Sequence, residues 1–119
     1  MFLKIKIIFF CFCIINIFCV GSNNPPIIDN IIAIPDSTAS GGSVLIICNA
    51  SDEEDKNSLN YLWESTLGEI NRVNDKDSIT WVAPNEIGYF SISCEVSDNN
   101  NGSSIETIAI KVFWCFLES

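Results

Sequence analysis

The sequence contains no histidine among its 119 residues. Histidine is the usual general base of serine and cysteine hydrolases and a common zinc ligand, so its absence excludes Ser-His-Asp and Cys-His catalysis and every histidine-based metal site. Basic residues are also scarce, because 6 Lys and Arg stand against 15 Asp and Glu, which gives a net charge of -9. An acidic chain repels phosphate backbones, and we therefore expect no binding to nucleic acid.

The few positive charges are unevenly placed. Lys4 and Lys6 precede an almost wholly apolar run over residues 7–18, and small residues follow it. This order predicts a secretory signal peptide over residues 1–21. The run is shorter than the ~20 residues of a spanning helix, although an uncleaved anchor or a lipid on Cys19 is an alternative. Removing two of the six basic residues and none of the fifteen acidic ones leaves a body with a net charge of -11.

The body shows no sustained helical periodicity. Its clearest pattern lies at residues 89–98, where apolar and polar side chains alternate as in a half-buried strand. Six further short strands are expected at residues 27–34, 44–49, 59–65, 69–74, 78–83 and 104–113, with a turn over 35–43. The sequence therefore predicts one all-β domain, a two-sheet antiparallel β-sandwich over residues 27–113, with a linker at 22–26 and a tail at 114–119.

Two cysteines and one tryptophan define the expected core. Cys48 and Cys94 fall on inward positions of their strands, and Trp63 lies between them in the sequence. This spacing is typical of immunoglobulin-like (Ig-like) sandwiches. In a secreted domain we expect a Cys48–Cys94 disulfide with Trp63 packed over it, and two buried free thiols are the alternative.

Several short motifs resemble the repeated extracellular modules of PKD type. They are Pro25-Pro26-Ile27, Tyr61-x-Trp63, Gly88-Tyr89-Phe90-Ser91-Ile92 and Val96-Ser97-Asp98, and the resemblance covers residues 23–112. The Trp-Asp-Phe-Gly-Asp-Gly signature of typical PKD domains is absent, because Trp63 continues as Glu64-Ser65-Thr66-Leu67-Gly68. The resemblance implies a spacer, an adhesion unit or an accessory domain beside a secreted enzyme.

The acidic loop after residue 51 is a candidate calcium site, since calcium prefers oxygen ligands. The candidate ligands are Asp52, Glu54, Asp55 and Asp98. A solvated acidic loop is the alternative, and it is the reading that we favour for a run of like charges.

Three other groups of residues are candidates for function. Glu64 and Glu69 flank a turn and could form a general acid/base pair, but no substrate cleft is predicted beside them. Three aromatic residues could form a sugar-binding platform, or could lie in the core: Tyr61, Trp81 and Trp114. Cys115 in the apolar tail could form a disulfide with another chain.

Together these observations predict a secreted or cell-surface, non-enzymatic Ig-like/PKD-like module with a structural or adhesion role. Its expected partner is an extracellular protein or a polysaccharide, with membrane contact only through an uncleaved N-terminal segment. The alternative is an accessory carbohydrate-binding module of a secreted hydrolase. An exposed pair of aromatic side chains would favour the alternative.

Overall fold

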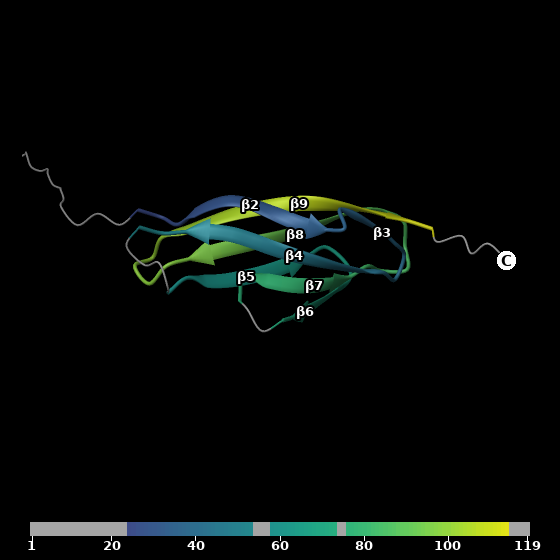
Figure 1. The fold of residues 1–119 in the computed structure, drawn as a ribbon, viewed down its shortest axis with the longest axis horizontal. Helices are drawn as coiled ribbons and strands as arrows, with labels where there is room; N and C mark the ends of the chain where they lie inside the picture. Colours follow the sequence, from purple (N-terminus) through teal and green to yellow (C-terminus); the bar gives the residue numbers. More distant parts are fainter. Residues whose placement is uncertain (1–23, 54–57, 74–75, 115–119) are drawn as a thin grey trace, which may run out of the picture.

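The computed structural model describes residues 24–53, 58–73 and 76–114. The predicted signal peptide at 1–21, Glu54, Asp55 and Cys115 lie outside these residues. Within them the chain forms eight strands and no helix (Figure 1). The strands are β2 (Ile27–Ile34), β3 (Ser37–Ala39), β4 (Ser43–Ser51), β5 (Asn60–Ser65), β6 (Glu69–Arg72), β7 (Ser78–Val82), β8 (Gly88–Ser97) and β9 (Ser103–Phe113).

The strands form two sheets of four, in the orders β2-β4-β7-β6 and β3-β9-β8-β5. The predicted all-β, two-sheet architecture is thus present. The expectation of purely antiparallel pairing was wrong at one place, because β3 pairs with β9 in parallel. This strand lies inside the stretch expected to be a turn. The chain crosses from the first sheet to the second at Pro35, whose peptide bond with Ile34 is cis.

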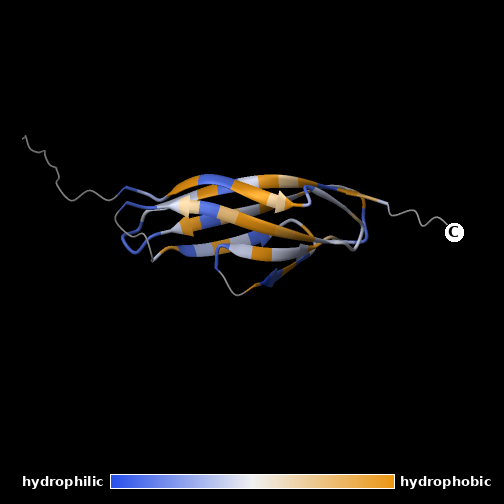
Figure 2. Ribbon diagram, in the orientation of Figure 1, coloured by the Kyte–Doolittle hydropathy of each residue, from blue (hydrophilic) through white to orange (hydrophobic). Residues whose placement is uncertain are grey.

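The core lies between the two sheets and follows the alternation of the strands (Figure 2). On β4, Val44, Ile46 and Cys48 are buried while their neighbours face outward. On β8 the same alternation buries every second side chain, namely Phe90, Ile92, Cys94 and Val96. β4 and β8 each have a neighbouring strand on both sides. β4 therefore lies near the centre of the inner face of the first sheet, and β8 near the centre of the inner face of the second.

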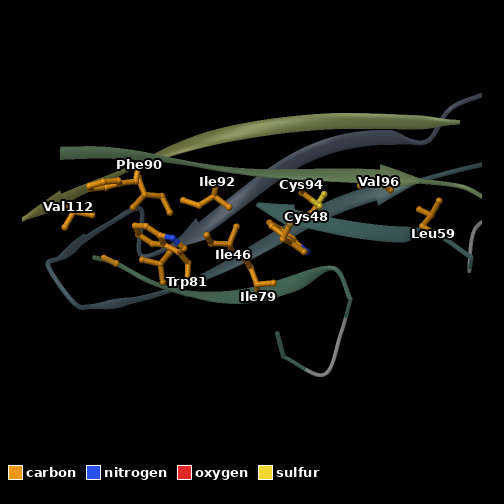
Figure 3. Close-up of a cluster of buried hydrophobic side chains, with 14 residues drawn as sticks. Ile46, Cys48, Leu59, Ile79, Trp81, Phe90, Ile92, Cys94, Val96 and Val112 are labelled. Carbon is orange, nitrogen blue, oxygen red and sulfur yellow. The ribbon is translucent and has the colours of Figure 1, made fainter. Parts of the chain in front are cut away.

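Trp81 on β7 is the largest side chain that is completely buried. Its indole N–H donates a hydrogen bond to the carbonyl oxygen of Leu67 at 2.9 Å, and its ring packs near Phe90 with centroids 6.3 Å apart (Figure 3). Gly68 adopts a φ of +88°, and a Cβ atom there would lie 2.5 Å from the indole nitrogen. The turn between β5 and β6 therefore requires glycine at this position.

Trp63 on β5 is 5% exposed and stands opposite Cys94 in the β5–β8 register. Its indole N–H donates to the carbonyl oxygen of Lys76 at 3.2 Å. Both core tryptophans thus have their polar atom hydrogen-bonded to a loop carbonyl, which avoids the cost of burying an unpaired donor.

The burial of Trp81 predicts a large loss of stability on truncation. Trp81→Ala should lower the free energy of unfolding by about 3–5 kcal/mol, because it removes a fully buried indole and leaves a cavity. Trp114→Ala is the control, because that side chain is 50% exposed and should be near neutral. Urea unfolding followed by circular dichroism measures both values. Equal midpoints for the two variants would contradict the assigned core.

Candidate functional site

A shallow depression of about 270 Å³ lies on the outer face of the second sheet. Its lining residues are polar and come from β5, β8, β9 and the turn after β5: Glu64, Ser65, Thr66, Ser91, Ser93 and Thr107. It is rich in hydroxyl groups, with one carboxylate.

The strand register explains why these residues meet. Ser93 on β8 lies opposite Glu64 on β5 and opposite Thr107 on β9, so the three form one row across the sheet. In the next row Ser91 faces Ala109. The outer face is hollow here because its central rows carry small side chains.

Backbone contacts fix one edge of the depression. The Thr66 amide donates to the Ser91 carbonyl at 3.0 Å, and the Ser91 amide donates to the Thr66 hydroxyl oxygen at 3.2 Å. These two bonds extend the β5–β8 pairing by one residue. They hold the Thr66 side chain in place as part of a preformed surface.

Larger apolar side chains border the depression along the strands. Tyr89 is 71% exposed and lies opposite Lys111, while Phe113, 44% exposed, is the next outward residue of β9. Leu62 and Ile105 border the other side, in the row that contains Glu95. The polar centre of the face is therefore flanked by two rows that each combine apolar side chains with one charged residue, Lys111 in one and Glu95 in the other.

The aromatic residues singled out from the sequence do not form this face. Trp81 is completely buried, Tyr61 is partly buried against the core, and only Trp114 is half exposed. Sequence reasoning overlooked Tyr89. The alternation of β8 could have indicated it, because Tyr89 shares its outward-facing side of the strand with Ser91 and Ser93.

The two glutamates considered as an acid/base pair belong to different sheets. Glu64 lies on β5 in the second sheet, and Glu69 begins β6 in the first. The turn between them carries the chain from one layer to the other. Only Glu64 lines the depression.

Two of the four candidate calcium ligands are described, and both are buried. Asp52 follows β4 and Asp98 follows β8, at the end of the sandwich to which both strands point (Figure 1). One Asp98 oxygen accepts hydrogen bonds from the amides of Asn100 at 2.8 Å and Gly102 at 2.7 Å. This carboxylate therefore caps the β8–β9 hairpin, where Asn101 has a φ of 71°.

In the described part of the chain, no group of three or more His, Cys, Asp or Glu residues could hold a metal ion. Glu54 and Asp55 lie outside that part, so calcium binding stays a prediction.

The end of the sandwich that carries Asp52 also has a depression of about 340 Å³, which is lined in part by Asn24, Ser51 and Asp52.

Cys48 and Cys94 meet across the two sheets, but as free thiols (Figure 3). The predicted disulfide is therefore not formed in this structure. The hydrogen bond between the thiols lowers the pKa of Cys48 and raises the pKa of Cys94, which burial raises further. Closing the bond would require removal of two protons and two electrons by an oxidant. The disulfide was predicted because a secreted protein folds in an oxidising compartment. The two cysteines lie close together whether or not the bond forms.

Comparisons with known proteins show a likeness of fold. No protein-family model and no curated protein matches the chain. A solved structure of a nucleoside hydrolase-related hypothetical protein from Saccharophagus degradans, described as associated with carbohydrate metabolism, superposes with a TM-score of 0.58 at 20% identity. The match covers 76% of this chain and 26% of that chain, so this chain corresponds to about a quarter of that protein. Among the described residues no helix is long and apolar enough to cross a membrane.

The hairpin role of Asp98 predicts a calcium-independent effect on stability. Asp98→Ala should lower the free energy of unfolding by about 1–3 kcal/mol, because two turn amides lose their acceptor. Asp98→Asn keeps one carbonyl oxygen and should lose less. Thermal unfolding with calcium and with a chelator measures both variants. A calcium-dependent rise in melting temperature that Asp98→Ala abolishes would instead assign Asp98 to a metal site.

Proposed function

We propose that the chain is a secreted or cell-surface, non-enzymatic Ig-like/PKD-like module with a structural or adhesion role, whose partner is an extracellular protein. The observation that supports the Ig-like part of this proposal is the strand order. The sheet β2-β4-β7-β6 matches the A-B-E-D sheet of a constant-type immunoglobulin domain, and β9-β8-β5 matches its G-F-C sheet.

The positions of three residues support the same reading. In that correspondence Cys48 lies on strand B, Cys94 on strand F and Trp63 on strand C, which is where immunoglobulin domains have their cysteine pair and core tryptophan. The tyrosine that antibody domains place two residues before the second cysteine is replaced by Ile92. The solved S. degradans structure contains this fold as about a quarter of a longer chain, which supports a modular role.

The mass of the secreted protein tests this proposal. The full-length sequence should be expressed in a secreting host and alkylated in denaturant, before and after reduction. We expect the product to begin near Ser22, with Cys48 and Cys94 alkylated only after reduction. Cys94→Ala is the matched control, because it should leave Cys48 open to alkylation without reduction. A retained N-terminus together with two freely alkylated thiols would contradict a secreted disulfide-bonded module.

A second candidate is a carbohydrate-binding module, and the depression on the outer face of the second sheet favours it. Serine and threonine hydroxyls and the Glu64 carboxylate can hydrogen-bond sugar hydroxyls, and the exposed Tyr89 ring offers an apolar face for stacking. A net charge of -11 on the body disfavours anionic polysaccharides, which leaves neutral ones. The association of the S. degradans protein with carbohydrate metabolism is consistent with this candidate.

Affinity electrophoresis against a panel of neutral soluble polysaccharides tests the second candidate. We expect one of them to retard the wild-type protein. Glu64→Gln should weaken that binding by about 10–100-fold, through loss of a charge-assisted hydrogen bond. Glu69→Gln makes the same chemical change on the other sheet and should have no effect. Equal retardation of the two variants, or no retardation of the wild type by any polysaccharide, would eliminate this candidate.

A further inference from the structure

The turn that joins β8 to β9 carries the only Asn-Gly pair in the sequence, Asn101-Gly102 (Figure 1). Asn101 is exposed and has a φ of 71°, a left-handed conformation that asparagine adopts more often than most residues with a side chain. Neither the core nor the depression on the second sheet includes this residue. Its side-chain amide is therefore a reactive group that the functions considered above do not use.

An asparagine that precedes a glycine can react with its own backbone. The amide nitrogen of Gly102 loses its proton and attacks the side-chain carbonyl carbon, Cγ, of Asn101. A bond forms between these two atoms, and the bond from Cγ to the side-chain nitrogen breaks, so that this nitrogen takes up a proton and leaves as ammonia. Water then opens the cyclic imide at either carbonyl and gives aspartate or isoaspartate. Because glycine has no Cβ, the approach of its nitrogen is unobstructed.

Hydrogen bonds hold the attacking nitrogen in the folded hairpin. The Gly102 amide donates to a carboxylate oxygen of Asp98 at 2.7 Å, and the Asp98 amide donates to the Gly102 carbonyl at 2.9 Å. The same carboxylate oxygen accepts the Asn100 amide at 2.8 Å, and Asp98 is only 6% exposed. Deprotonating the Gly102 nitrogen would place a second negative charge beside this buried carboxylate, and like charges in contact disfavour one another. The closed hairpin therefore suppresses the reaction.

We propose that Asn101 is a self-deamidation site whose rate is set by Asp98, through the hydrogen bond from the Gly102 amide. The reaction proceeds when the hairpin opens, and a turn can open locally while the sandwich stays folded. Each product adds a negative charge to a turn that already contains Asp98. Isoaspartate also inserts one more carbon atom into the backbone between β8 and β9. This inference does not rest on the proposed function.

Timed incubation of the full-length chain at neutral pH tests the proposal. Ion-exchange chromatography separates deamidated chains, because each is more acidic than its parent, and peptide mapping locates the change at residue 101. Asp98→Ala should deamidate roughly 10–100-fold faster than the wild type, since it loses a charge-assisted hydrogen bond. Asp98→Asn keeps a carbonyl oxygen as acceptor and should react at an intermediate rate. A chelator in the buffer excludes any contribution from a metal ion.

Two variants and one condition serve as controls. Ile79→Val shortens a completely buried side chain in the first sheet, so it lowers stability without touching the hairpin and should react at the wild-type rate. Asn101→Gly removes the reacting amide, keeps a residue that accepts positive φ, and should abolish the acidic product. The wild-type chain in guanidinium gives the rate of the open turn, which should be the fastest. Circular dichroism verifies folding, and Asp98→Asn carries the comparison if Asp98→Ala is unfolded.

Three results would overturn the proposal. The first is an equal rate of deamidation at residue 101 in the folded wild type and the folded Asp98 variants. The second is an Ile79→Val rate that matches that of Asp98→Ala, because global stability and not the hairpin bond would then set the rate. The third is no conversion at residue 101 in guanidinium, which would show that Asn101 does not react even in an open chain.

Discussion

The fit between the buried Trp81 indole and the turn at Gly68 is the constraint that links the core to the point where the chain changes sheet. The hydrogen bond to the Leu67 carbonyl allows the Trp81 side chain to be completely buried without leaving its indole N–H unpaired. The bond can form only because Gly68, without a Cβ, lets the backbone of the turn approach the ring. The same turn carries the chain from β5 in one sheet to β6 in the other. The indole that fills the core therefore also contacts the turn at which the chain changes layer.

Once the layers are fixed, the alternation of each strand decides what its outer face presents. The outward residues of β8 and β9 around Ser93 and Thr107 are small and hydroxylated, whereas those of β2 and β4 around Ile34 and Leu45 are aliphatic. The sandwich therefore has two chemically different faces. One is polar at its centre and the other is aliphatic, and neither draws on the residues that stabilise the core.

The alternation of residues 89–98 predicted β8 well, because a half-buried strand needs only local sequence. It could not reveal β3, since Ser37-Thr38-Ala39 has no distinctive pattern and is held by pairing with distant Lys111–Phe113. The depression was equally hidden, because Glu64, Ser93 and Thr107 come together only through the register of three strands. The sequence also could not show whether Trp81 faces the core or the solvent. Apolar residues lie on both sides of its strand, at 79 and 82, so the alternation of β7 does not indicate which side is buried.

The parallel pairing of β3 with β9 has a mechanical consequence. β2 begins at one end of the sandwich and β9 finishes at the opposite end (Figure 1). Tension applied along the long axis at these two ends would pull β3 and β9 in opposite directions along their lengths. The hydrogen bonds that join Ser37–Ala39 to Lys111–Phe113 lie across that direction. They would be loaded together in shear and would have to rupture as a group instead of unzipping one by one.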